Sequence, residues 1–294
     1  DRALAWNWHL DMICDHLEAV SAGQIRDLLI NVPPGCSKSL TVSVFWPAWE
    51  WSRHPEIRYL CASYDQALST RDNRRLRDLI TSDWYQERWP NVVLREDQNQ
   101  KTRYDTTAGG WRIGTSIGGR AAGEHPHRKI IDDPHTPARA LSELERQEVI
   151  HYYDQTLSTR GVLLGAATVV IMQRLHEQDL SGHILERGGF VHICLPMRWE
   201  RGRMSETVIG RKDPREKPGE LLWPEMFSQR AIDDLVSTKL GLSGEAGQLQ
   251  QRPAPEGGAM FKREWFKPIS ALPSDIIAEL RFWDVAGTEG GTGA

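Results

Sequence analysis

One short stretch, NVPPGCSKS at residues 31–39, limits the possible folds more than any other part of the chain. The apolar run at 28–30 before it is typical of a buried strand, and residues 40–46 after it can continue as a helix. In a turn between a strand and a helix, backbone N–H groups can converge on an anion, which the helix dipole also favours. The sequence therefore predicts a phosphate-binding loop in an α/β fold.

This loop departs from the pattern G-x-x-x-x-G-K-[ST] at both glycines. Val32 and Ser37 hold the two glycine positions, and only Gly35 supplies backbone freedom. We expect Lys38 to reach the outer phosphates of a nucleotide and the hydroxyl of Ser39 to bind magnesium. An ordinary turn with an incidental Lys-Ser pair is the alternative. The predicted nucleotide-binding residues of the loop are Pro34, Gly35, Cys36, Ser37, Lys38, Ser39 and Leu40.

A second motif, KIIDDP at residues 129–134, places two carboxylates after a short apolar strand. We expect Asp132 to hold the magnesium shell, usually through water, and Asp133 to polarise the attacking water. Adjacent carboxylates are also common at turns, so the motif alone is moderate evidence for a nucleotide site. Lys38 and Ser39 upstream make that interpretation specific. Together the two motifs predict a P-loop domain that hydrolyses ATP with Mg²⁺.

Two further side chains are candidates for contacts with the nucleotide. Gln173 follows the apolar strand 166–172, where it can sense the terminal phosphate, and the alternative is an ordinary strand-end amide. His9 precedes the loop by about one helix and can stack on adenine, and the alternative is a capped surface histidine. Both are predicted site residues.

Three arginines share one face of a helix expected at 65–80. Arg71, Arg74 and Arg75 fall together by the i, i+3, i+4 rule. They form either a patch that faces DNA or another subunit, or a solvated face paired with nearby aspartates.

The bulk composition excludes several classes of protein. The net charge of −4 over 294 residues gives no overall basic field, although a local basic groove is compatible with it. The four cysteines are widely spaced and form no CxxC, which favours reduced cytosolic thiols over a disulfide framework or zinc site. The sequence shows no signal peptide and no apolar run of about 20 residues, so we expect no membrane span.

Strands and helices alternate through the first two thirds of the chain, which predicts a mainly parallel sheet flanked by helices. Helices are expected at 4–20, 40–51, 65–80, 140–156 and 228–240, and strands at 28–30, 57–63, 129–131, 166–172, 190–195 and 280–287, with short strands within 90–115. Residues 200–220 are charged and rich in Gly and Pro, as in a loop.

Four stretches in order resemble the large terminase subunits of tailed double-stranded DNA phages. They are PPGCSKS with FWPAW at 33–49, GGR leading to IIDDPH at 118–135, IMQRLHEQDL at 171–180, and RFWD at 281–284. Each stretch alone is a weak or moderate signal, but the ordered set is specific and covers nearly the whole chain.

The resemblance implies an ATPase motor that pumps viral double-stranded DNA through a portal into a preformed capsid. It implies a P-loop fold of the additional-strand, catalytic-carboxylate type in 1–195, a lid subdomain and linker in 196–275, and the first strand of an RNase H-like nuclease in 276–294. Asp284 would be the first metal-binding aspartate of that nuclease. Its remaining acidic residues are absent, so this chain is not expected to cut DNA.

The resemblance also implies partners and a location. The partners would be double-stranded DNA, the portal protein, the small terminase subunit and further copies of the chain in a ring. We expect a pentamer on the capsid, with a monomer as the alternative in solution. The location would be the host cytoplasm, with a transient stay at the procapsid portal.

Three departures from the family affect the expected site. Ser37 replaces the usual glycine before the lysine, and the catalytic carboxylate, often Glu, is Asp133. The start of the loop holds no arginine, although P-loop hydrolases often need a cation on the transition-state phosphate. We hypothesise that a neighbouring subunit supplies Arg120, with Arg128 and Arg174 as fallback choices.

Two other functions remain open at this stage. A helicase-like DNA-dependent ATPase would share both nucleotide motifs, although RFWD at 281–284 argues against it. A docking module of the capsid machinery that no longer hydrolyses ATP is compatible with the substitution at Ser37.

Overall fold

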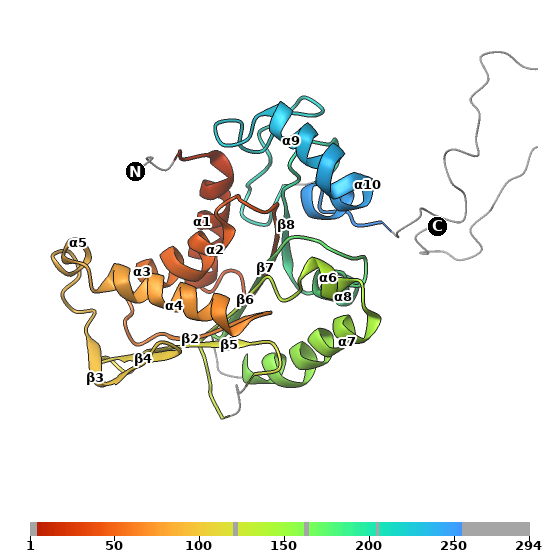
Figure 1. The fold of residues 1–294 in the computed structure, drawn as a ribbon. Coiled ribbons are helices and arrows are strands. Elements are labelled where there is room, and N and C mark those ends of the chain that lie inside the picture. The colour runs from red at the N-terminus through yellow and green to blue at the C-terminus, as the bar shows by residue number, and fades with distance from the viewer. Residues whose placement is uncertain (1–4, 120–122, 162–164, 204–205, 255–294) are drawn as a thin grey trace, which may run out of the picture. The chain divides into compact units, whose positions relative to one another are not determined.

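An eight-stranded sheet lies at the centre of the protein, whose computed structural model describes residues 5–119, 123–161, 165–203 and 206–254 (Figure 1). In sheet order its strands are β3 (Leu94–Asn99), β4 (Arg103–Thr106), β5 (Trp111–Ser116), β2 (Arg58–Ser63), β6 (Arg128–Asp132), β7 (Ala167–Met172), β1 (Asp27–Asn31) and β8 (Val191–Cys194). The six strands from β5 to β8 run parallel, and β3 and β4 extend the sheet as antiparallel neighbours. The predicted fold class is therefore confirmed.

The position of β7 identifies the type of P-loop fold. It pairs with β1 on one side and with β6 on the other, so one strand separates the strand before the loop from the strand that ends at Asp132. All six residues of β7 and all five of β6 are buried, as expected for parallel strands covered on both faces. This is the additional-strand arrangement that the sequence resemblance implied.

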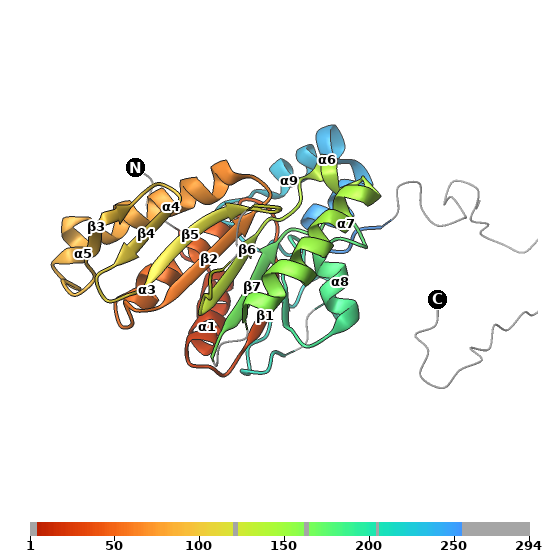
Figure 2. The ribbon, with the colours of Figure 1, turned by 90° about the horizontal axis from the view of Figure 1, so that it is seen from below.

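Helices cover both faces of the sheet (Figures 1 and 2). The α-helices are α1 (Trp8–Ser21), α2 (Lys38–Leu40), α3 (Trp46–Trp51), α4 (Gln66–Ile80), α5 (Asp83–Gln86), α6 (Pro137–Ala140), α7 (Glu143–Tyr152), α8 (Leu180–Arg187), α9 (Gln229–Leu235) and α10 (Gly241–Gly244). Short π-helical segments are η1 (Thr41–Phe45), η2 (Tyr153–Leu157), η4 (Val236–Leu240) and η5 (Glu245–Leu249), and η3 (Ser158–Gly161) is a 3₁₀ turn. The helix expected at 140–156 is thus α7 continued by η2.

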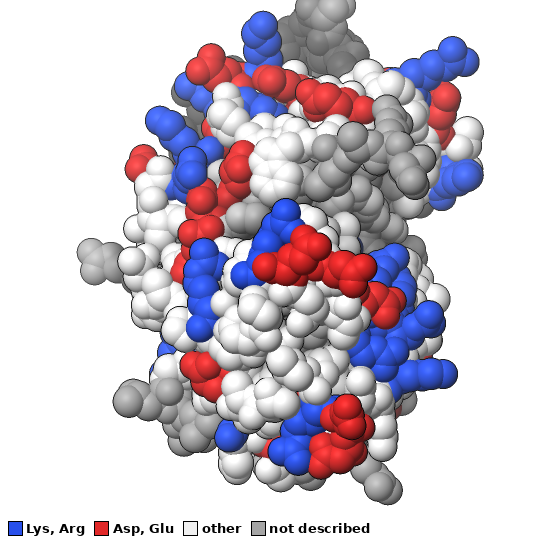
Figure 3. All heavy atoms as spheres, turned by 90° about the vertical axis from the view of Figure 1, so that its left-hand side faces the viewer, with Lys and Arg blue, Asp and Glu red and all other residues white. Residues whose placement is uncertain are grey.

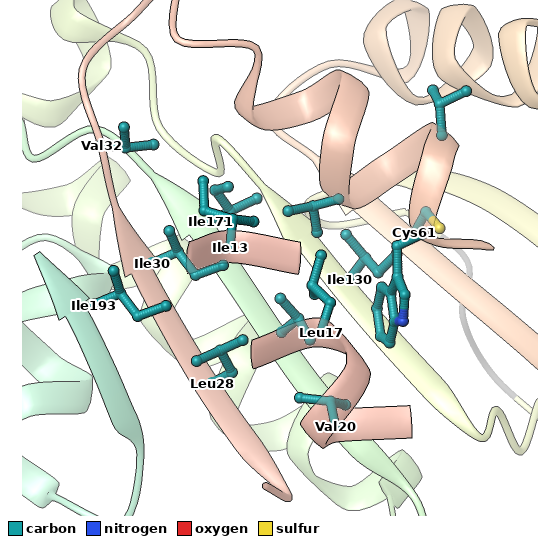
Figure 4. Close-up of a cluster of buried hydrophobic side chains, with 14 of the residues drawn as sticks. Ile13, Leu17, Val20, Leu28, Ile30, Val32, Cys61, Ile130, Ile171 and Ile193 are labelled. Carbon is teal, nitrogen blue, oxygen red and sulfur yellow. The ribbon is translucent and has the colours of Figure 1, made fainter. Parts of the chain in front are cut away.

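Two hydrophobic clusters fix these layers, because alternate residues of each strand point to opposite faces. On β2, Tyr59 and Cys61 belong to one cluster, whereas Leu60 and Ala62 belong to the other. Figure 4 shows the first cluster, in which side chains of α1 meet those of the parallel strands β1, β2, β6, β7 and β8. The second cluster packs residues of α7, η2 and α8 against the opposite face.

The helix ends follow capping rules that the sequence displays. Asp65 accepts from the backbone N–H of Ala67 at the start of α4. The predicted cap at Ser142 is present, because its hydroxyl accepts from the N–H of Glu145. None of the described helices is both long and apolar enough to cross a membrane.

The segment after β8 folds back towards α1 and the phosphate loop. Residues 206–220 hold no helix or strand in the structure, as expected, and α9 and η4 take the place of the helix predicted at 228–240. The side-chain amide of Asn7 donates to the carbonyl of Leu222 (2.7 Å), which joins this segment to the start of α1. The division at residue 195 stays a prediction, and the strand expected at 280–287 lies outside the described residues.

Candidate active site

The predicted phosphate loop connects β1 to α2 and adopts a strained conformation. Gly35 has a φ of 80° and Ser37 a φ of 56°, both in the left-handed region. That conformation explains why a glycine is usual at position 37, since an L-residue there costs about 1–2 kcal/mol. A Cβ at Gly35 would lie 3.0 Å from Cζ of Phe227, so the loop is also packed against the segment after β8, which contains Phe227.

Asn31, at the end of β1, anchors the start of the loop. Its side-chain amide is fully buried and donates to the carbonyl of Met172 (3.1 Å) and to the hydroxyl of Ser181 (2.8 Å). The Nε2 atom of His192 lies 2.8 Å from its Oδ1 atom. Burial lowers the pKa of His192 to about 4, so the neutral ring donates this hydrogen bond. Nothing in the local sequence indicates that Asn31 anchors the loop, because its partners lie far away along the chain.

The two predicted motifs meet at the carboxyl ends of β1 and β6. The ammonium of Lys38 lies 2.6 Å from Oδ2 of Asp133 and is almost fully buried. The hydroxyl of Ser39 donates to Oδ1 of Asp132 (2.9 Å), and that of Ser43 donates to Oδ2 (2.8 Å). Ser43, one turn further along η1, is a site residue that the sequence analysis missed. The structure thus brings together Lys38, Ser39, Asp132 and Asp133.

Asp132 lies in an environment that disfavours its charge. Burial, followed by the negative charge of Asp133, raises its pKa to about 7, although Lys38 and the bond from Ser43 act in the opposite direction. A divalent cation beside it would favour the ionised form, because opposite charge lowers a carboxyl pKa.

The oxygens of Ser39 and Asp132 fit magnesium, which prefers oxygen ligands and keeps several waters. Within the described ranges, no group of three or more His, Cys, Asp or Glu side chains could hold a metal ion. Ser39 and Asp132 would hold the ion, with phosphate oxygens and water as further ligands.

Asp133 is held by its backbone as well as by Lys38. Its φ of 44° is in the left-handed region, and such strain in a non-glycine residue is often found at functional sites. Its N–H donates to the carbonyl of Ile171 (2.9 Å), and its carbonyl accepts from the N–H of Tyr64 (3.2 Å). Its Oδ1 atom accepts from the N–H of Gln173 (3.2 Å). The two neighbouring strand ends thus impose the unusual conformation.

Gln173 and Arg174 connect this site to the C-terminal segment. The N–H of Arg174, next along the chain, donates to Oε1 of Gln251 (2.9 Å). The Oε1 atom of Gln173 is buried and has no hydrogen-bond partner among the described residues. Gln173, Ser39, Asp132 and Asp133 all line one cavity of about 300 Å³, which extends under α4.

The comparisons with known proteins bear on the fold. No protein-family model matches the sequence, and no curated protein matches it. A solved structure of a variant ATPase domain of the Thermus phage P74-26 large terminase matches with a TM-score of 0.50, at 11% identity, over 81% of this chain and 93% of that one. The chain has the fold of a large terminase ATPase domain.

Two further terminase structures match at lower scores. Another structure of the P74-26 domain has a TM-score of 0.46 and 13% identity, over 78% of this chain and 90% of that one. The large terminase of a thermophilic bacteriophage, solved in complex with ADP, has a TM-score of 0.46 and 9% identity, over 79% of this chain and 51% of that one.

His9 and Cys36 are buried at the base of the loop in this terminase fold. The ring of His9 lies 4.8 Å from that of Trp223, and its Nε2 atom lies 3.4 Å from the carbonyl oxygen of Cys36. Burial lowers the pKa of His9 to about 4. The ring is fully buried in these contacts, so its predicted stacking on adenine gains no support here. Burial also raises the pKa of the Cys36 thiol to about 12, which suits a small filler.

A second cavity beside the loop was not predicted. It has a volume of about 170 Å³, lies between α1 and the helical segments after the loop, and is lined by Trp6, Ser37, Leu40 and Phe45 among others. Trp6 is 55% exposed, so its indole is accessible at this cavity.

The candidate arginines divide into three groups. Arg120, like Asp284, lies outside the described residues. Arg128 starts β6, at the end opposite Asp132, and its guanidinium is buried against Glu50 (2.7 Å). Arg174 is bound to Asp179 through its Nε atom (3.0 Å). Neither fallback arginine is therefore free to reach a phosphate in this structure.

The arginines of α4 pair locally. Arg71 binds Asp72 with two hydrogen bonds (2.9 and 3.0 Å), and Arg75 adds a third (3.2 Å). This contact agrees with the solvated-face alternative for Arg71 and Arg75. All three arginines are exposed. On the face of the molecule in Figure 3, acidic and basic side chains are interspersed.

Proposed function

We propose that this chain is the ATPase part of a packaging motor that drives double-stranded viral DNA into a procapsid. The observation that carries the proposal is the pairing of Lys38 with Asp133 and of Ser39 with Asp132 across the inserted strand β7. In this proposal the loop binds phosphate, Ser39 and Asp132 are the magnesium ligands and Asp133 is the catalytic carboxylate, the set of groups that ATP hydrolysis requires. The large-terminase fold makes packaging the motor function we favour.

In the proposed reaction, the backbone N–H groups of residues 35–39 and the ammonium of Lys38 bind the β- and γ-phosphates. Ser39 and Asp132 would hold magnesium, which would supply positive charge to neutralise the phosphates. Asp133 accepts a hydrogen bond from the attacking water, and Gln173, whose Oε1 atom has no partner among the described residues, helps to orient that water.

The contact between Lys38 and Asp133 suggests how binding of ATP would activate the catalytic carboxylate. In this structure the lysine that would bind phosphate neutralises the carboxylate that would activate water (2.6 Å). A bound triphosphate competes for the ammonium and leaves Asp133 free to accept a hydrogen bond. The carboxylate thereby becomes active only when substrate is present.

The cavity at Trp6 is suited to the base of the nucleotide. It adjoins Ser37 and Leu40, and its lining is largely aromatic and aliphatic. An indole and a purine can stack through their faces, as aromatic pairs do. We therefore assign adenine to this cavity in preference to His9.

A ring of subunits completes the site in this proposal. We keep Arg120 of a neighbouring copy as the cation on the transition-state phosphate, and a pentamer bound to the portal as the working assembly. Double-stranded DNA and the small terminase subunit are the other partners. The proposed location is the host cytoplasm, with a transient stay at the procapsid portal.

The test is the rate of ATP hydrolysis as a function of protein concentration, with and without double-stranded DNA. We expect the rate per chain to rise with concentration and with DNA, because the site is completed in trans. Lys38→Ala and Asp133→Ala should each lower the rate by about 10²–10⁴-fold. The matched controls are Lys101→Ala and Asp97→Ala, both exposed positions.

Four results would change all or part of this assignment. Equal rates in Lys38→Ala and the parent would refute the ATPase, and a parent without activity at any concentration would favour the docking module. Separation of forked DNA strands would favour a helicase-like enzyme. A rate per chain that is independent of concentration would refute catalysis in trans and leave hydrolysis itself intact.

A further inference from the structure

A buried guanidinium lines the cavity that contains the proposed catalytic residues. It belongs to Arg112 on β5, whose side chain is fully buried beneath α4. The same cavity is lined by Ser39, Asp132 and Gln173. No step of the proposed hydrolysis uses Arg112.

Two of the three nitrogens of this guanidinium have no acceptor among the described residues. Its Nε atom donates to Oδ1 of Asn73 (2.6 Å), whereas Nη1 and Nη2 are buried without a hydrogen-bond partner in that part of the chain. Buried polar groups are nearly always hydrogen-bonded, and an isolated buried cation is costly. The two free donors therefore indicate a ligand with negative charge.

Asn73 fixes the direction of the guanidinium. Its Nδ2 atom donates to the carbonyls of Lys101 (3.3 Å) and Thr102 (3.1 Å). It also lies against Gly114, where a Cβ would come within 2.7 Å of Nδ2. The side chain of Asn73 therefore cannot rotate away from Arg112. It binds the Nε atom of Arg112, and Nη1 and Nη2 lie on the side of the guanidinium that faces away from Asn73.

The nearby carboxylates already have partners of their own. Asp72 is bound by Arg71 and Arg75, and Asp133 is bound by Lys38. Asp132 accepts hydrogen bonds from Ser39 and Ser43. The thiol of Cys61 also lines the cavity and is neutral, because burial raises its pKa to about 11. Among the described residues, the positive charge of Arg112 thus lacks a paired anion.

We propose that Arg112 binds inorganic phosphate in this cavity, as the product that leaves the catalytic site. A guanidinium presents parallel N–H groups that match two oxygens of a phosphate, which a lysine cannot do. The identity of the anion rests on the proposed function, because hydrolysis beside Asp132 and Asp133 releases phosphate into the same cavity. The phosphate is held by Nη1 and Nη2 before it departs.

The test is the affinity of the full chain for inorganic phosphate, measured by calorimetry without nucleotide and with saturating ADP and Mg²⁺. Arg112→Met removes the charge and keeps much of the volume, and Arg74→Met on the exposed face of α4 is the control. We expect one phosphate site that persists with ADP, an affinity at least tenfold lower in Arg112→Met, and no change in Arg74→Met. In the ATPase assay, Arg112→Met should weaken inhibition by added phosphate by a similar factor.

Equal phosphate affinity in the Arg112→Met and parent chains would refute the proposal. Circular dichroism shows whether the variant folds; if it does not, crystals of the parent chain soaked in selenate decide the matter. Anomalous scattering from selenium beside Arg112 is the expected result, and selenate found elsewhere only would refute it. A chain that binds phosphate at Arg112 but never hydrolyses ATP would contradict the proposed function and leave the anion site standing.

Discussion

Replacing Asp132 by Asn should change how stability depends on pH, because the protein makes this carboxylate hard to ionise. Its pKa is raised to about 7 from an ordinary value of 3.8, mainly by burial and then by the charge of Asp133. The folded state therefore holds the proton more tightly than the unfolded chain does. As a result, the contribution of Asp132 to the free energy of unfolding falls as pH rises from about 4 to about 7.

The size of this effect follows from the shift. One pKa unit corresponds to about 1.4 kcal/mol, so Asp132 should destabilise the parent by about 2–3 kcal/mol more at pH 8 than at pH 5. Asn mimics the protonated carboxyl and does not titrate. The stability of Asp132→Asn relative to the parent should therefore increase by that amount between the two pH values.

Urea denaturation of both chains at pH 5 and pH 8, without magnesium or nucleotide, measures the difference. Asp97→Asn is the control: Arg95 lowers the pKa of the exposed Asp97, so its titration lies below this window. A stability gap between Asp132→Asn and the parent that stays constant from pH 5 to pH 8 would refute the reasoning. Magnesium with ADP should stabilise the parent more at pH 8 than at pH 5, since the cation favours the ionised carboxylate.

Three further substitutions test other parts of the site. Asn31→Ala should cost about 2–3 kcal/mol in urea denaturation and raise the KM for ATP, because it leaves His192 and other buried partners unsatisfied. Ser37→Gly should raise the Tm and keep activity, with a gain of about 1 kcal/mol from relief of the left-handed conformation; a lower Tm would contradict this. Trp6→Ala should raise the KM for ATP with little change in kcat, whereas Trp84→Ala, equally exposed on α5, should change neither.

Local patterns in the sequence were sufficient for the main elements of the fold. The apolar run before the loop is β1, the capping residue Ser142 starts α7, and the carboxylates after β6 meet Lys38. The last of these follows from topology, because parallel strands bring their carboxyl ends to one edge of a sheet. A correct order of strands thus places the catalytic candidates together.

Contacts between residues that are distant in sequence could not be predicted from local patterns. His9 lies against Trp223, and Asn31 binds residues more than 140 positions away, so neither environment has a local signal. The direction of the Arg112 amino groups, which lack partners within the described ranges, depends on Asn73, and the position of Asn73 depends in turn on Gly114. A polar side chain becomes buried when helices and strands that are distant in sequence pack around it, and hydrophobic periodicity does not predict this.

Two successive peptide groups bind partners in different parts of the molecule. The amide of Gln173 is bound to the carboxylate of Asp133, and the next amide is bound to Gln251. Each peptide unit is planar, and the two units share the Cα atom of Gln173, so only the φ and ψ of this residue can absorb a displacement between them. One residue, Gln173, therefore separates the contact with the carboxylate from the contact with Gln251, and a shift of Asp133 when Lys38 is drawn to a phosphate has a short route to the segment after β8.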